Sequence, residues 1–143
     1  MANRVFFRLY QASNLMHRTG TRAVSKHGAT TQQWAVMGAL SRQGIDDVGM
    51  PVKDLMAFLC VSRQRLTLVL SRMEGLGLIE RTRLDGDGRV RRVRLTAAGR
   101  KCWTAMLRDI RSYYDNALAE FSPDEVWTLF VLMDRLTARL NLV

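Results

Sequence analysis

The sequence has few of the residues that build covalent or metal-bound scaffolds. It contains two cysteines, Cys60 and Cys102, which lie in different segments and form no Cys-x-x-Cys or Cys/His pattern. A disulfide framework or a structural zinc site is therefore not expected, and both cysteines are expected to act as small buried hydrophobic residues. We predict no metal ion and no cofactor.

The motifs of common enzyme classes are also missing. The sequence has no Gly-rich phosphate loop, no His-Glu-x-x-His pair and no nucleophile elbow, and its two histidines have no evident carboxylate partner. An Asp-Gly-Asp-Gly run begins at Asp85 like a calcium-binding loop, but the twelfth position of that loop is Thr96 instead of glutamate. These absences predict that the protein is not an enzyme and does not bind calcium.

Long apolar runs are absent as well. No segment approaches the roughly twenty apolar residues that a membrane-spanning helix needs. The first residues, MANRVFFRLYQASN, lack the features of a secretory signal peptide. At 143 residues the chain has the length of one ordinary domain. We therefore expect a single-domain, cytoplasmic protein without a membrane partner.

Arginine supplies most of the positive charge. The chain carries 22 Lys and Arg residues against 13 Asp and Glu residues, a formal net charge of +9, and only Lys26, Lys53 and Lys101 are lysines. A guanidinium group pairs with phosphate through two hydrogen bonds and can read guanine edges, which an ammonium group does less well. The composition favours a nucleic-acid partner, although a merely basic surface would give the same count.

Apolar periodicity predicts helices in the first third of the chain. Residues 3–26 repeat apolar positions at intervals of three and four, which predicts an amphipathic helix that Gly28 ends. Thr30 and Gln33 form a capping-box pattern that opens a second helix, extending to Gly44. Because this second helix is apolar nearly all round, we expect it to be buried.

Two further short helices form a candidate helix-turn-helix. Pro51 suits the first turn of the third helix, and Ser62 can cap the fourth after a brief turn. The fourth helix has an apolar side and a polar side, formed by Leu66, Val69, Leu70 and Met73 and by Arg63, Gln64, Thr67 and Ser71, respectively. In a pair of this kind, the first helix can pack against the rest of the domain, and the second can present its polar residues.

A basic hairpin follows the helix pair. Two strand-like runs, GLGLIERTRL and RVRRVRLT, flank the turn Asp85-Gly86-Asp87-Gly88. Their arginines alternate in facing, so we expect only some to touch phosphate and others to pair with acids such as Glu74 and Glu80. A hairpin in this place is the wing of a winged helix-turn-helix. The predicted fold class is therefore mainly α with a small β-hairpin wing.

The two last helices have strong apolar stripes. Thr96 can cap a long helix, and Ser122 to Glu125 form a capping box for the terminal one. The two stripes comprise Trp103, Met106, Leu107, Ile110, Tyr114 and Leu118, and Val126, Leu129, Phe130, Met133, Leu136 and Leu140. The terminal helix and the aromatic-rich first helix both need a partner. A dimer with interleaved chain ends would provide it, and packing within one chain is the alternative.

The order of these elements resembles that of the MarR family of bacterial transcription regulators. The resemblance is most specific in VSRQRLTLVLSRMEGLGLIER and in DGRVRRVRLTAAG, and it covers nearly the whole chain. It implies one MarR-type domain over residues 1–143, with dimerisation helices at about 3–28 and 97–142 and a DNA-binding lobe at about 30–96. It also implies a homodimer on a palindromic DNA site, and repression is the usual habit of the family.

The resemblance and the chemistry of the side chains together indicate a set of DNA contacts. The fourth helix would enter the major groove, where Gln pairs with adenine and Arg with guanine. Arg89 at the wing tip would reach the minor groove, with Asp87 holding its guanidinium in place. The candidate DNA-binding residues are Ser62, Arg63, Gln64, Arg65, Thr67, Arg72, Asp87, Arg89 and Arg91.

Regulators of this family are typically switched by a small molecule, often a phenolic or aromatic acid. We expect an effector such as an aromatic acid or its coenzyme A thioester, bound where the dimerisation helices meet the DNA-binding lobe. The candidate effector-binding residues are Asn14, His17, Arg18, Trp34, Met37 and Trp103. Each of them could instead have a purely structural role in the core.

Two other functions remain open from the sequence. Cys60 lies beside the helix-turn-helix, where neighbouring arginines could lower its pKa and make it a redox switch. A basic module that binds nucleic acid without sequence preference would also carry this charge, but it would not need Gln64 and Thr67 on a presented helix.

Overall fold

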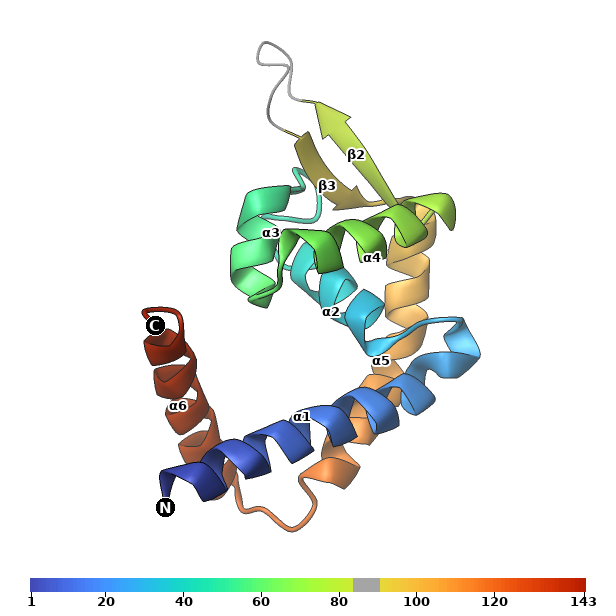
Figure 1. The fold of residues 1–143 in the computed structure, drawn as a ribbon. Coiled ribbons are helices and arrows are strands. Elements are labelled where there is room, and N and C mark those ends of the chain that lie inside the picture. Colours follow the sequence, from blue (N-terminus) through green and yellow to red (C-terminus); the bar gives the residue numbers. More distant parts are fainter. Residues whose placement is uncertain (84–90) are drawn as a thin grey trace. The chain divides into compact units, whose positions relative to one another are not determined.

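The computed structural model describes residues 1–83 and 91–143, which are mostly helical with one small sheet (Figure 1). The chain divides into two compact units, Met1–Ile110 and Arg111–Val143, and each is described by itself. The predicted fold class, α-helical with a β-hairpin, agrees with these elements. The predicted turn at residues 85–88 lies outside the described residues.

The first helix ends two residues before the predicted Lys26, and the predicted stop at Gly28 is present. Helix α1 spans Ala2–Val24 and passes into a short 3₁₀ helix, η1, at Ser25–His27. Gly28 follows with a left-handed φ of 71°, a conformation that glycine adopts without steric cost, and its N–H donates to the carbonyl of Ser25.

Helix α2 spans Thr31–Leu40 and begins with the predicted capping box. The Thr30 side chain accepts from the backbone N–H of Gln33, whose own side chain accepts from the N–H of Thr30. The prediction that this helix extends to Gly44 is wrong. The side chains of Ser41 and Arg42 donate to the carbonyls of Gly38 and Ala39, and thereby take acceptors that a further helical turn would use.

A short strand precedes the third helix. Strand β1, Met50–Pro51, pairs antiparallel with β3, so the sheet order is β1-β3-β2. Helix α3 spans Val52–Leu59. Pro51 therefore caps this helix from the strand and does not occupy its first turn.

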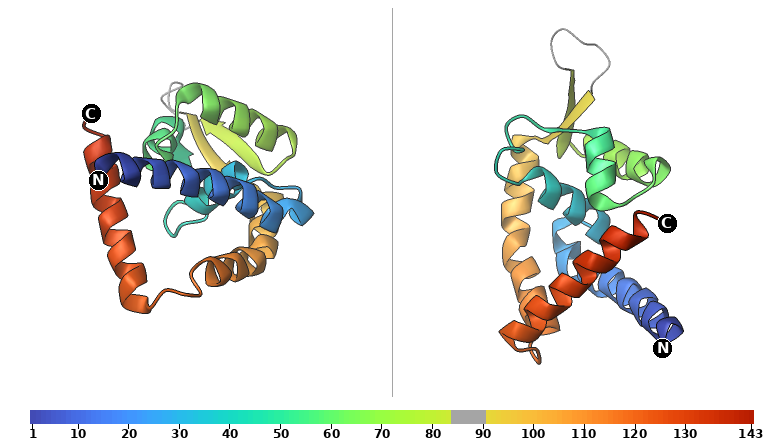
Figure 2. Two further views of the ribbon diagram at one scale, coloured as in Figure 1. Left: turned by 60° about the horizontal axis from the view of Figure 1, so that its bottom comes forward. Right: turned by 90° about the vertical axis from the view of Figure 1, so that its left-hand side faces the viewer.

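The helix-turn-helix and the hairpin form as predicted. Helix α4 spans Arg63–Gly75 with Ser62 as its N-cap. Strands β2, Ile79–Arg83, and β3, Arg91–Leu95, pair antiparallel and extend beyond α3 and α4 in Figure 1 and in the right-hand view of Figure 2. Helix α5 begins directly after β3 and spans Ala97–Ala117, with the Thr96 hydroxyl accepting from the N–H of Gly99.

One core joins the elements of the first unit. Its fully buried side chains come from α2, α3, α4, the sheet and the first half of α5, and they include Met37, Leu40, Leu55, Leu66, Leu70, Met73, Ile79, Val93, Leu95 and Met106. This core holds α4 and the sheet in a fixed position relative to each other. The burial of α2 agrees with its predicted apolar character.

The prediction that both cysteines are buried is wrong for Cys60. Its side chain is exposed, whereas Cys102 is half-buried and burial raises the pKa of its thiol. Cys60 ends α3 in the left-handed conformation, with φ 53°. A non-glycine residue is uncommon in this conformation, and nothing in the sequence predicts the conformation at this position.

The second unit contains the end of α5 and helix α6, Pro123–Leu140. The predicted capping box is present, because Ser122 accepts from the N–H of Glu125 and the Glu125 carboxylate accepts from the N–H of Ser122. The bond from the backbone N–H of Ser122 to the carboxylate, followed by the Ser122 side chain, holds the pKa of Glu125 below its usual value. Within residues 1–83 and 91–143, no helix is long and apolar enough to cross a membrane.

Candidate nucleic-acid interface

Helix α4 is held by its first turn and by its buried side. The Ser62 hydroxyl accepts from the backbone N–H of Arg65 at 3.3 Å, which fixes the helix start. Leu66, Leu70 and Met73 are buried in the core of the first unit. With that side anchored, the remaining side chains of α4 must face outward.

The outward side of α4 carries six of the predicted DNA contacts. Ser62, Arg63, Gln64, Arg65, Thr67 and Arg72 are all exposed. Leu68 lies among them and is 75% exposed, although it was not predicted as a contact. The sequence held a signal for it, since Leu68 falls outside the apolar repeat of Leu66, Leu70 and Met73. A leucine in this position can contact a thymine methyl group in the major groove.

The sheet separates its arginines onto two faces. Side chains alternate along a strand, and Val93 and Leu95 of β3 are buried, so Arg91 shares their face. In β2, Ile79 and Arg81 pair with Leu95 and Val93 and lie on the same face. The opposite face carries Glu80 and Thr82 of β2, opposite Arg94 and Arg92 of β3.

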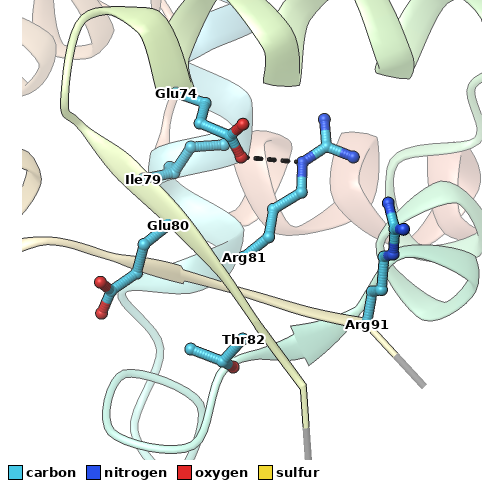
Figure 3. Close-up of a pocket in the computed structure, with 6 residues that line it drawn as sticks. All are labelled: Glu74, Ile79, Glu80, Arg81, Thr82 and Arg91. Carbon is cyan, nitrogen blue, oxygen red and sulfur yellow. Dashed lines mark hydrogen bonds and ion pairs between the residues drawn. The ribbon is translucent and has the colours of Figure 1, made fainter. Parts of the chain in front are cut away.

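Two ion pairs hold arginines of this sheet. The Nε of Arg81 lies 3.0 Å from a carboxylate oxygen of Glu74, and Arg94 donates to Glu80. Glu74 and Glu80 are the acids that the sequence predicts as arginine partners. Figure 3 shows the guanidinium groups of Arg81 and Arg91 on one side of the strands, while Glu80 points away.

A basic recess lies where the strands meet the helix-turn-helix. It has a volume of about 450 Å³ and is lined by Pro51, Val52, Lys53, Arg63, Thr67, Arg81 and Arg91. Four of these side chains are cationic, and none of the described lining residues is acidic. The structure thus brings together Arg63, Thr67 and Arg91, which were predicted, with Lys53 and Arg81, which were not. Asp87 and Arg89 lie outside the described residues.

The missed cations follow from topology. Lys53 comes next to the recess because β1 pairs with β3 and hands the chain directly to α3. Arg81 reaches it because the register of β2 and β3 places it on the buried face. Neither the pairing of β1 with β3 nor the exact register of β2 against β3 could be read from residue order.

A second hollow lies on another side of α4, among α1, α2 and the turn between α3 and α4. It has a volume of about 310 Å³, and its lining includes Met16, His17, Thr31, Gln32, Trp34, Ala35, Val36, Leu59, Cys60, Val61, Arg65, Leu66 and Val69. We call it the α1–α4 pocket. The Nδ1 of His17 lies 2.8 Å from the hydroxyl of Thr31, which fixes the ring against the first turn of α2.

The predicted effector residues divide around this pocket. His17 and Trp34 line it. Asn14 and Arg18 are exposed on α1 and do not line it, and Met37 is fully buried in the core. Trp103 of α5 packs on α2, where a Cβ at Gly38 would meet its ring at 3.2 Å. The pocket also includes Cys60 and Arg65, which were not predicted as effector contacts.

Known proteins with similar sequences and folds are transcription regulators. A sequence model of the MarR family matches residues 27–90. The transcriptional activatory protein BadR of Rhodopseudomonas palustris is 49% identical over 127 residues, which cover 88% of this chain and 72% of BadR.

Two solved structures extend the likeness to the fold. The PcaV regulator of Streptomyces coelicolor, in complex with its natural ligand, is 27% identical, with a TM-score of 0.77 over 95% of this chain and 91% of PcaV. A mutant of MarR from E. coli, complexed with operator DNA, has a TM-score of 0.82 over 93% of each chain at 20% identity.

The predicted family and fold class are confirmed by these similarities, and so is the prediction that the protein is not an enzyme. An exposed polar helix face beside an arginine-rich hairpin is also what a winged helix needs in order to hold a duplex. The chain belongs to the MarR family and is a DNA-binding, winged-helix transcriptional regulator.

Proposed function

We propose that this protein binds a palindromic operator as a homodimer and that an aromatic acid, or its coenzyme A thioester, releases it. The observation that carries this proposal is the arrangement of α4. Its exposed face presents Gln64 and Leu68, and the basic recess lies along one of its edges. Residues suited to base readout and residues suited to phosphate binding are therefore neighbours on α4, which supports the proposal.

The two parts of this surface do different work. Gln64 can pair with adenine, and Leu68 can contact thymine methyl groups, so both discriminate between base pairs. Lys53, Arg81 and Arg91 supply positive charge for phosphate contacts, and contacts of this kind set the position of the protein on the duplex. Asp87 and Arg89 remain candidates for the flanking minor groove.

Exposed apolar side chains support the homodimer. Phe7 and Tyr10 of α1 are 62% and 68% exposed, and Trp127 and Phe130 of α6 are 66% and 58% exposed in the single chain. Monomeric proteins rarely leave so many large apolar side chains in water. The predicted dimerisation helices, at about 3–28 and 97–142, carry these side chains, and a twofold axis would present two copies of α4 to two half-sites.

A selection on random DNA tests the operator. We expect enrichment of an inverted repeat whose half-sites are centred about 10 base pairs apart. Inserting five base pairs between the half-sites should abolish tight binding, because the second half-site moves to the opposite side of the duplex. If this insertion does not affect binding, or if excess genomic DNA competes as well as the selected site, the protein is a basic module that binds nucleic acid without sequence preference.

The α1–α4 pocket is the proposed effector site. Trp34, Leu59 and Val69 provide apolar walls, while His17 and Arg65 provide polar groups. PcaV, a relative of similar fold, is known in complex with its natural ligand. A panel of aromatic acids and their coenzyme A thioesters should contain compounds that raise the melting temperature and release DNA. If no compound does both, this pocket is not the switch.

The direction of regulation has two candidates. The family resemblance predicts repression, whereas the relative BadR is named as an activatory protein. In vitro transcription from a promoter that carries the selected operator distinguishes them: the free protein lowers transcript yield if it represses and raises it if it activates. In this assay, the position of the operator relative to the promoter is the variable to change.

A thiol switch is the second candidate, because Cys60 is exposed and lines the pocket. Peroxide should then weaken DNA binding by the wild-type protein and leave a Cys60→Ser variant unaffected. Equal loss in both proteins would exclude this mechanism.

A further inference from the structure

The side chains of α4 leave the helix in three directions. Successive residues of an α-helix are about 100° apart. With Leu66, Leu70 and Met73 buried, Gln64 and Leu68 occupy the centre of the outward face. The two edges beside the buried face hold different residues, and the lining of the two hollows shows where each edge faces.

Arg63 and Arg65 lie on opposite edges of α4. Arg63, with Thr67, lines the basic recess beside the strands. Arg65, with Val69 one turn later, lines the α1–α4 pocket. Arg65 is nevertheless in the first turn of α4, which is the part of such a helix that approaches DNA. It is the arginine of this turn that belongs to both the DNA-binding helix and the pocket.

The chemistry of the pocket favours a flat anion. Its walls are largely apolar and include one indole, and the Nδ1 of His17 is already engaged with Thr31. Among the described lining residues none is acidic, and the described part of the chain gives the Arg65 guanidinium no ion pair. A planar carboxylate matches the shape of a guanidinium group and can accept two parallel hydrogen bonds from it.

We propose that Arg65 is the residue that couples the effector to the operator: an aromatic carboxylate in the α1–α4 pocket pairs with Arg65 and so removes this cation from DNA. The inference rests on the proposed function and specifies its switch. Because coupling free energy is reciprocal, operator DNA must weaken carboxylate binding by the same factor by which the carboxylate weakens DNA binding. No large movement of the helix is required.

The test compares Arg65→Gln with Arg63→Gln, a matched loss of one charge two residues away on the other edge of the helix. The probes are benzoate and its uncharged counterpart benzamide, titrated against the tryptophan fluorescence of each protein without DNA. Operator affinity is then measured for each protein with and without saturating benzoate, across a series of salt concentrations.

For the wild type we expect benzoate to bind more tightly than benzamide, and saturating benzoate to weaken operator binding about tenfold or more. Arg65→Gln should lose both the preference for the carboxylate and the effect of benzoate on DNA. Its salt slope should fall by about one, because one phosphate contact is lost. Arg63→Gln should weaken DNA binding while keeping the carboxylate preference and the coupling.

Two results overturn the inference in distinguishable ways. If Arg65→Gln still prefers benzoate and still releases DNA on binding it, the effector function stands and Arg65 is not its switch. If neither probe binds the wild type at any concentration that leaves it folded, both the pocket as an anion site and the role of Arg65 in it are refuted.

Discussion

At the scale of single residues, a very close backbone approach lies at Gly99. A Cβ at this position would sit 2.0 Å from the carbonyl oxygen of Leu78, an acceptor that already bonds the N–H of Thr96. The Thr96 hydroxyl also donates to the carbonyl of Gly77. These contacts tie the start of α5 to the segment that joins α4 to the wing.

We therefore expect Gly99→Ala to destabilise the protein by about 1–3 kcal/mol, because backbone must shift to admit the methyl group. Gly75→Ala is the matched control: a Cβ there meets nothing within 4 Å, and alanine is the better helix former. Denaturant unfolding of both variants measures the difference. Equal stability of the two would show that the α4–α5 junction yields easily.

A second residue-scale prediction concerns Asp109 of α5. Its carboxylate lies 2.6 Å from Nε2 of His27 and 2.8 Å from Nζ of Lys26. Hydrogen bonds from His27 and then Lys26 hold the pKa of Asp109 below its ordinary value of 3.8. Since the folded protein lowers this pKa, the pair stabilises the fold above the unfolded pKa and loses its effect as pH falls through the folded one.

Asp109→Asn should thus melt below the wild type at pH 7, and the two melting temperatures should converge as pH falls below 3.8. Asp115→Asn, an exposed change in the same helix, is the control and should follow the wild type throughout. A difference between wild type and Asp109→Asn that persists into strong acid would exclude an electrostatic origin.

Single residues also show what the sequence could reveal. The caps at Thr30, Ser62 and Ser122 were predictable because a cap involves neighbours in the chain. The left-handed end of α3 at Cys60 was not predictable, because no adjacent glycine marks it. Helix caps can be predicted because they depend on neighbouring residues, whereas an uncommon backbone angle depends on the packing around it.

At the scale of elements, the two faces of the hairpin give a contrasting pair of variants. Arg91 shares the face of the buried Val93 and lines the basic recess, while Arg94 lies on the other face in a pair with Glu80. Arg91→Gln should weaken operator binding at all sequences alike and lower the salt slope by about one. Arg94→Gln should leave the slope unchanged. Fluorescence anisotropy over a range of salt concentrations distinguishes them.

The sequence predicted which segments form helices and strands better than it predicted which way their side chains face. Strong periodicity and turn residues identified the helices and the hairpin strands. Strand β1 was not predicted, because two residues form no periodic pattern. The position of Lys53 beside the basic recess was therefore not predicted either. Which strand arginines reach the recess depends on the register of β2 against β3, a long-range property that the alternation of arginines alone leaves open.

At the scale of the whole molecule, family and fold class followed from the order of the elements, because that order is specific even where single motifs are weak. The exposed face of α4, which is the proposed DNA-binding surface, was also largely predictable, since α4 is one continuous segment. The α1–α4 pocket was only partly visible. It gathers side chains from residues 16 to 69, and of the predicted effector set it includes His17 and Trp34.

The dimer is the prediction that concerns the assembly. Phe130 of α6 is 58% exposed and its ring lies 5.5 Å from that of Trp127, so an aspartate there would put an unpaired charge into the proposed interface. We expect Phe130→Asp to weaken dimerisation by at least about 2 kcal/mol. Ala138→Asp, an exposed site of α6 outside the apolar stripe, adds the same charge and should remain dimeric. Sedimentation at micromolar concentration measures both. Because one α4 helix would reach only one half-site, the monomeric variant should also lose the dependence of operator binding on half-site spacing, and a wild type that sediments as a monomer would contradict the twofold arrangement altogether.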